Sequence, residues 1–180
     1  MIESLNAHGK AGVVVPHGVL FRGAAEGRIR TEILNEDILE AVVGLPSNLF
    51  FGTGIPAAII IFNREKKNKE KVLFIDASKD FVAGKNQNSL SENHINHIVE
   101  VFTDFHDNQK DAGILKDKFA YIATLEEIKE NDYNLNIPRY VDTYEEEAEI
   151  DLAEVQQKIA ELQNELADVQ KQMDEYLKLF

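Results

Sequence analysis

Short apolar runs, each bounded by glycine, proline or polar residues, recur along the first half of the chain. Four of them are Gly12–Val15, Leu39–Leu45, Ala57–Phe62 and Val72–Ala77. Their length and their content of β-branched residues predict strands, and their continuous hydrophobicity predicts that the strands are buried. Between the first two runs, apolar residues at helical spacing predict a short helix over 26–35.

The lengths of the connections predict how these strands pair. The segment between 39–45 and 57–62 has about ten residues and no helical pattern, which is too short for a parallel crossover. These two strands should therefore be antiparallel neighbours. The runs at 12–15 and 39–45 are joined by the predicted helix, as a parallel pair would be. The pattern predicts an α/β fold whose sheet is mostly parallel, with one antiparallel member near its edge.

The rest of the body alternates polar segments with shorter apolar ones. A charged turn covers 64–71, and a polar loop over 81–88 precedes a helical pattern over 91–105. A short strand–helix unit ends near Glu130, and the stretch 131–144 is irregular. The lysines of the charged turn, interpreted as solubilising, are Lys66, Lys67, Lys69 and Lys71.

The C-terminal segment has a different period. From Leu152 onward, apolar residues fall alternately three and four positions apart without glycine or proline, which is typical of a coiled coil. A helix of about 30 residues would be about 45 Å long and would overhang a small body, so it favours a partner chain over packing on its own domain. Residues 145–180 are thus interpreted as an acidic linker and a coiled-coil arm, which leaves homodimer and heteromer open. The predicted partner-binding positions are Leu152, Val155, Ile159, Leu162, Leu166, Val169, Met173 and Tyr176.

The net charge of −13 is unevenly distributed. Residues 141–180 hold 12 acidic residues and 3 lysines, hence −9 of the total, which leaves −4 for the first 140 residues. A nearly balanced body can carry a local basic face for DNA. The absence of cysteine excludes disulfides and thiolate metal sites. With neither a signal-peptide pattern nor an apolar run long enough for a bilayer, we expect a cytoplasmic protein without a membrane partner.

The loop 46–54 is the best candidate for a binding role, because it leaves the carboxyl end of a strand, where open α/β sheets bind ligands. It contains two adjacent aromatic residues, Phe50 and Phe51. Either ring could stack on a planar group such as a nucleobase extruded from DNA, and the alternative is that both pack into the core. Gly52-Thr-Gly54 precedes a strand rather than a helix, which argues against a cofactor fingerprint.

Basic residues follow the first predicted strand. Arg22, Arg28 and Arg30 could contact DNA phosphates, or they could form a solvated helix face. His94 and His97 lie one helical turn apart, but no carboxylate at ligand spacing accompanies them, so no metal site is predicted. No Ser/His/Asp or paired-carboxylate arrangement stands out, so no catalytic residue is assigned.

Five motifs occur in order along the chain. They are Gly9–Gly23, Leu45–Pro56, Val72–Ser78, Gly84–Asn88 and Asn131–Val141. Together they resemble the adenine-N6 DNA methyltransferase subunit of type I restriction–modification systems. The likeness covers essentially the whole chain, and it is a likeness to the C-terminal portion of that subunit.

The resemblance implies a partial Rossmann-like methyltransferase sheet, with parallel strands and an antiparallel hairpin, followed by a long C-terminal coiled-coil helix. Residues 1–144 would form the C-terminal half of the methyltransferase domain. The whole enzyme would extrude adenine from the duplex and methylate it from S-adenosylmethionine, with Phe50, or Phe51 as the fallback, stacking on the base. The family's cofactor loop and Asn-Pro-Pro-aromatic motif would precede residue 1. No cofactor-binding or metal-binding residue is therefore expected here, and S-adenosylmethionine is not expected to bind this chain alone.

The resemblance also implies partners. The family's C-terminal helices pack against the specificity subunit, so the expected partners are that subunit, the remaining part of the methylation subunit, and DNA in the assembled complex. The residues alone leave a rival from another class, a non-catalytic coiled-coil interaction protein that sequesters a partner or forms a homo-oligomer through its arm. An unpaired strand edge would also favour self-association.

Overall fold

The computed structural model describes residues 2–143 and, in the C-terminal segment, the helical residues 156, 158, 159, 161–163, 165, 166, 169, 170 and 173. The chain divides into two units, Met1–Tyr144 and Glu145–Phe180. The acidic linker and three of the predicted partner-binding residues, Leu152, Val155 and Tyr176, lie outside the described residues.

The first unit is built on a sheet of six described strands, in the order β1-β3-β2-β4-β6-β5. The strands are β1 (Lys10–Pro16), β2 (Leu39–Gly44), β3 (Ala57–Asn63), β4 (Lys71–Asp76), β5 (Gly113–Lys116) and β6 (Ala120–Thr124). The helices are α1 (Ala24–Asn35), α2 (Glu92–Asp107) and α3 (Leu125–Glu130), with short 3-10 helices η1 (Ile2–Ser4), η2 (His17–Leu20) and η3 (Ile137–Arg139). The elements follow the predicted order, with two strands, β5 and β6, where one was predicted.

The strand pairing confirms one prediction and corrects another. β2 and β3 are antiparallel neighbours, as their short connection predicted. The predicted parallel pairing of the first two long strands is wrong, because β3 lies between β1 and β2 and is antiparallel to both. Among the described strands only β2 and β4 pair in parallel, so the sheet is mixed and not mostly parallel. Helices on both faces bury the central strands whatever their direction, so continuous hydrophobicity did not report the strand direction.

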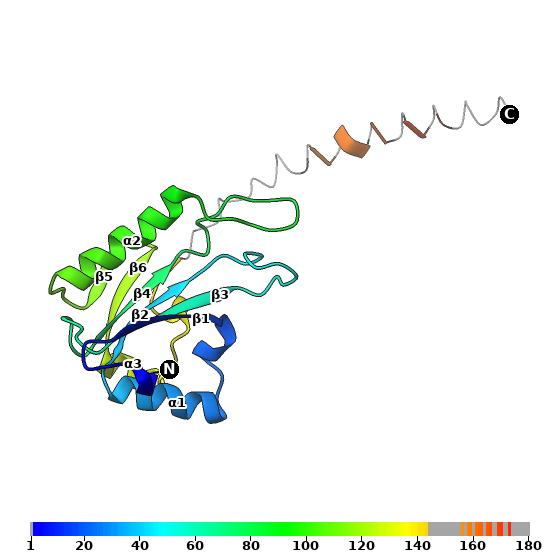
Figure 1. Ribbon diagram of the computed structural model, residues 1–180. Helices are drawn as coiled ribbons and strands as arrows, with labels where there is room; N and C mark the ends of the chain where they lie inside the picture. Colours follow the sequence, from blue (N-terminus) through cyan, green and yellow to red (C-terminus); the bar gives the residue numbers. More distant parts are fainter. Residues whose placement is uncertain are drawn as a thin grey trace. The chain divides into compact units, whose positions relative to one another are not determined.

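Helices cover both faces of the sheet. Figure 1 shows α1 and α3 on one face and α2 on the other. Successive side chains of β2 alternate between the two cores, with Val42 on the α1/α3 side and Ala41 and Val43 on the α2 side. The whole of β2 is buried. This central strand therefore provides a rigid support for the loop that follows it.

β1 departs from the predicted buried strand. Its residues alternate between exposed and half-buried, and the side chain of Val14 is 55% exposed. β1 lies at one edge of the described sheet and pairs with β3 alone. Its other edge therefore presents backbone N–H and C=O groups that no described strand bonds.

Lys66 corrects the interpretation of the charged turn as wholly solvated. Its side chain is buried, and its amine donates to the carbonyl oxygens of Leu39, at 2.9 Å, and of Lys71, at 3.1 Å. The amine also forms an ion pair with Asp37. Burial lowers the pKa of Lys66, and the bond to Asp37 opposes that change. Lys66 thus fixes the turn against β2 instead of solubilising it.

Tyr140 holds the segment after α3 against the sheet. Its ring stacks on Phe74 with centroids 4.0 Å apart, and its hydroxyl donates to the carbonyl oxygen of Asn134 at 2.6 Å. Burial is the main cause that raises the pKa of Tyr140, and the negative charge of Glu127 adds to it. The fold therefore favours the neutral phenol.

This raised pKa predicts a loss of stability at alkaline pH. Below about pH 10 tyrosine is neutral in both folded and unfolded chains. At higher pH the unfolded chain ionises Tyr140 while the fold keeps it neutral, so the free energy of unfolding should fall as pH rises. In urea unfolding measured between about pH 8 and 11, Tyr140→Phe should show a shallower decline. Part of the decline should remain in this variant, because burial also raises the pKa of Tyr121. An unchanged decline in Tyr140→Phe would contradict this assignment.

Candidate functional site

The loop after β2 carries the adjacent aromatic residues. The backbone N–H of Thr53 donates to the carbonyl oxygen of Phe50 at 3.4 Å, which closes a turn. Gly52 sits inside this turn at φ +77°, a conformation that glycine adopts without strain. Phe51 is also inside the turn, and its side chain is 89% exposed.

Phe50 lines an apolar pocket of about 240 Å³ at one end of the sheet. Val14, Val15 and Pro16 of β1 form part of this pocket, and Ile55 and Pro56 also line it. The Phe50 side chain is 45% exposed, and Phe51 is not among the lining residues. The alternative that both rings pack into the core is therefore wrong.

A second loop holds the aromatic loop from outside. The side-chain Nδ2 of Asn88 donates to the carbonyl oxygen of Ser47 at 3.0 Å. The backbone N–H of Asn88 donates to the carbonyl oxygen of Asn48 at 2.8 Å. Gln87 Nε2 donates to the carbonyl oxygen of Leu49 at 2.5 Å. Sequence reasoning assigned no role to these two amides. The sequence feature that could have indicated such a role is their position in a polar loop after β4, which pairs in parallel with β2.

His17 ties the end of β1 to the start of β3 near this pocket. Its backbone N–H donates to the carbonyl oxygen of Pro56 at 3.1 Å. Burial lowers the pKa of His17, and the charge of Asp76 raises it by a smaller amount. Burial thus favours the neutral form of this imidazole.

The three arginines proposed for DNA contact occupy different environments. Arg22 is exposed and lies 3.8 Å from the carboxylate of Glu26, and Arg28 is exposed. Arg30 is 9% exposed, and its guanidinium donates to the carbonyl oxygens of Val19, at 2.7 Å, and Tyr133, at 3.2 Å. Arg30 therefore joins α1 to η2 and to the segment after α3, so it is not part of a solvated helix face. Contact of Arg30 with a DNA phosphate stays a prediction.

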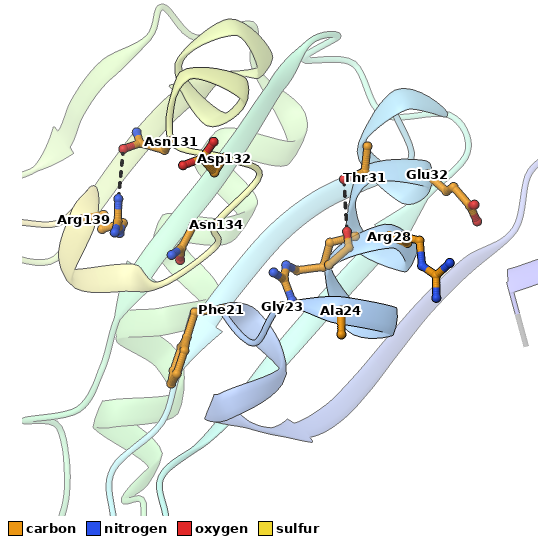
Figure 2. Close-up of a pocket in the computed structure, with 12 residues that line it drawn as sticks. Phe21, Gly23, Ala24, Arg28, Thr31, Glu32, Asn131, Asp132, Asn134 and Arg139 are labelled. Carbon is orange, nitrogen blue, oxygen red and sulfur yellow. Dashed lines mark hydrogen bonds between the residues drawn. The ribbon is translucent and has the colours of Figure 1, made fainter.

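A larger pocket, of about 550 Å³, lies between the start of α1 and the segment 131–139. Figure 2 shows Arg28 and Glu32 projecting from α1 on the side away from Arg139 and Asn131. Arg139 donates to the side-chain oxygen of Asn131 at 3.4 Å. The pocket therefore does not bring Arg28 and Arg139 together around one anion.

The described part of the chain contains no group of three or more histidine and acidic side chains arranged to hold a metal ion. Nor does it contain a helix with the length and hydrophobicity needed to cross a membrane. His94 instead caps α2, accepting a bond from the backbone N–H of Ser91 at 3.3 Å, and His97 lies 2.9 Å from a carboxylate oxygen of Asp80.

Five apolar positions of the predicted arm are described, and all five are helical. Each side chain is at least half exposed, from 50% for Ile159 to 60% for Val169. The others are Leu162, Leu166 and Met173. The described part of the arm thus carries exposed apolar side chains at the predicted positions.

Comparisons with known proteins give a consistent result. The family model described as N-6 DNA Methylase matches residues 1–149. The type I restriction enzyme MjaVIII methylase subunit of Methanocaldococcus jannaschii is 38% identical over 155 residues, which are 83% of this chain and 25% of that protein. The HindI methylase subunit of Haemophilus influenzae is 37% identical over 163 residues, 88% of this chain and 36% of that protein.

A solved structure extends the likeness to the fold. The crystal structure of the type I restriction-modification methyltransferase subunit from Streptococcus thermophilus superposes on 76% of this chain and 27% of that one, with a TM-score of 0.67. The two sequences are 51% identical. The chain thus spans about a quarter to a third of the length of the proteins it matches. The family match over residues 1–149, together with these relatives, shows that the chain belongs to the N-6 DNA methylase family and is part of a type I methylation subunit.

Proposed function

We propose that this chain is the C-terminal part of a site-specific adenine-N6 DNA methyltransferase subunit of a type I restriction–modification system. It contributes one wall of the target-adenine pocket and an arm that docks the specificity subunit, and it is inactive alone. The observation that carries the proposal is the apolar pocket lined by Phe50 at the end of the sheet.

The pocket beside β1 suits an uncharged planar group. Its lining is mainly apolar, with Val14 and Ile55 beside the Phe50 ring and Thr53 as a polar member. An adenine extruded from the duplex has flat faces that stack on an aromatic ring, and such a contact is worth about 1–3 kcal/mol. Phe51, at the tip of the turn, is the second candidate for this contact.

Arg22 and Arg28 are proposed to contact the DNA backbone. Both are exposed, and both follow β1 in the chain. The last residues of β1 line the pocket. The ion pair of Arg22 with Glu26 is exposed and 3.8 Å long, so a phosphate can compete for it. Contacts of this kind fix the register of a protein on DNA without reading its sequence.

The family implies S-adenosylmethionine as the methyl donor of the whole enzyme. The described residues do not fit this cofactor, because Gly52-Thr-Gly54 leads into β3 and not into a helix, as a cofactor-binding glycine loop would. No step of the transfer is therefore assigned to a cofactor site in this chain. The chain's own contribution is to bind and orient the base.

The edge of β1 is the proposed contact with the remaining part of the methylation subunit. Its unbonded backbone groups and half-exposed valines are suited to pairing with a further strand. The match covers only 25% and 36% of the length of two relatives, which leaves ample sequence to supply that strand. The helical surface of Ile159, Leu162 and Leu166 is the proposed contact with the specificity subunit.

Complementation tests the proposal. The chain is mixed with the remaining part of a methylation subunit and with a specificity subunit, and transfer of a labelled methyl group to adenine is measured. We expect transfer from the full mixture and none from the chain alone. Deleting residues 151–180 should abolish co-elution with the specificity subunit.

The opposite outcome would favour the interaction-protein alternative. In that outcome the chain would form a stable homo-oligomer, would not assemble with the other components and would not restore methyl transfer. Loss of self-association on deletion of 151–180 would then assign it to the arm, and its persistence would favour pairing through a strand edge.

A further inference from the structure

The segment 84–88 has no role in the proposed function, yet it contacts the loop that carries Phe50. Three donors of this segment reach three successive carbonyl oxygens of the aromatic loop, those of Ser47, Asn48 and Leu49. Hydrogen bonds to successive backbone carbonyls restrict the conformations that an irregular loop can adopt. The contact therefore constrains the backbone immediately before Phe50.

The segment is itself anchored at its base. Val82 and Ser89 exchange two backbone hydrogen bonds, of 2.8 and 3.0 Å, and close the loop into a narrow hairpin. Asp80, just before this hairpin, lies 2.9 Å from Nδ1 of His97 on α2. The base of this hairpin is therefore tied to α2 independently of the aromatic loop.

Gly84 explains the tight path of the segment. A Cβ added at this position would lie 2.0 Å from the backbone carbonyl oxygen of Gln87. No side chain fits there, so glycine is required for the close approach that orients Gln87 and Asn88. The spacing of the motif Gly84–Asn88 thus has a geometric reason.

We propose that Asn88 and Gln87 are positioning residues that hold the aromatic loop so that the Phe50 ring faces the base pocket. This inference rests on the proposed function, in which Phe50 stacks on the target adenine. Neither amide touches the base. They act through the carbonyl oxygens of Ser47, Asn48 and Leu49, which restrict the backbone that carries the ring.

Asn86 provides a matched control. It is an exposed asparagine of the same segment, and no interaction of its side chain is present among the described residues. Asn88→Ala removes the bond to Ser47, whereas Asn86→Ala removes an amide of the same size that reaches no loop carbonyl. Asn88→Asp keeps the shape of the side chain and loses its N–H donor.

Hydrogen exchange measured on the 180-residue chain tests the positioning itself. In Asn88→Ala and Asn88→Asp, the amide of Thr53, which donates to the carbonyl oxygen of Phe50, should exchange faster than in the unmodified chain, and in Asn86→Ala it should not. Unchanged exchange in both Asn88 variants would overturn the proposal. This readout does not depend on what Phe50 binds.

Methyl transfer by the reconstituted complex tests the consequence. Asn88→Ala should lower turnover about 3- to 10-fold, the effect of one hydrogen bond, with little change in KM for S-adenosylmethionine. In a Phe50→Ala background the same change should cost nothing further, because Asn88 acts through that ring. An equal loss in both backgrounds would overturn the proposal. Full activity of Phe50→Ala itself would instead refute the stacking role, and with it the catalytic consequence, while exchange still reports whether Asn88 holds the loop.

Discussion

Replacing Phe50 by alanine is expected to lower methyl transfer by the assembled complex about 10- to 100-fold. The ring forms the aromatic wall of the apolar pocket, and stacking of a base on such a ring is worth about 1–3 kcal/mol. An extruded adenine without this contact would return more often to the duplex. Turnover should therefore fall more than the affinity of the complex for DNA.

The matched control is Phe51→Ala, which removes a ring of the same kind from the exposed tip of the turn. We expect less than about a 3-fold effect from it, since an exposed side chain outside the pocket loses little on truncation. A duplex with 2-aminopurine at the target position gives a second readout, because stacking on an aromatic ring alters the fluorescence of an extruded base. If Phe51→Ala impaired transfer and Phe50→Ala did not, the assignments of the two rings would have to be exchanged.

Lys66→Ala should destabilise the first unit by about 3 kcal/mol. The substitution leaves Asp37 without its cation. It also leaves the buried carbonyl oxygen of Leu39 and the partly buried one of Lys71 without their donor. A buried acceptor without a partner costs the full free energy of its desolvation, and this cost exceeds the net free energy of the hydrogen bond. Urea unfolding followed by circular dichroism measures the change.

Two comparisons separate the amine from the rest of the Lys66 side chain. Lys66→Met keeps most of the apolar stem, so it should recover the packing contribution and none of the electrostatic one. Lys67→Ala alters the neighbouring lysine, which is about half exposed and lies 3.8 Å from the Asp107 carboxylate, and should cost less than about 1 kcal/mol. Equal losses at positions 66 and 67 would contradict the assigned role of the buried amine.

The elements of the body follow from the sequence more directly than their arrangement does. The connection after β2 has no room for a crossover helix, and this alone predicted its antiparallel pairing with β3. Nothing in that connection determines the side of β2 on which β3 adds. The structure puts β3 between β1 and β2, so the strand that leads into α1 becomes an edge strand.

Long polar side chains were the hardest to interpret. Lys66 lies in a run of charges and Arg30 on a charged helix, and both patterns are typical of solvent-exposed side chains. Their burial depends on carbonyl oxygens from distant segments, 27 residues away for the Lys66–Leu39 bond and 103 for the Arg30–Tyr133 bond. Local pattern contains no information on partners so far along the chain.

The candidate site was predicted in part. The position of the aromatic loop after a central strand pointed to Phe50 and Phe51, and pocket geometry then separated the two rings. The roles of Gln87 and Asn88 depend on two loops meeting in space. Their amides carry no charge or periodicity that would distinguish them from a solvated loop.

The strand order also affects how the chain behaves while it is being made. β1 leaves the ribosome before its partner β3, which lies about 45 residues further along the chain. At about 5–20 residues per second, the ribosome needs on the order of 2–9 s to supply that partner. During this interval Val13, Val14 and Val15 form an apolar segment of the nascent chain whose partner β3 is still missing. Such a segment is a binding site for chaperones and, without them, a starting point for aggregation.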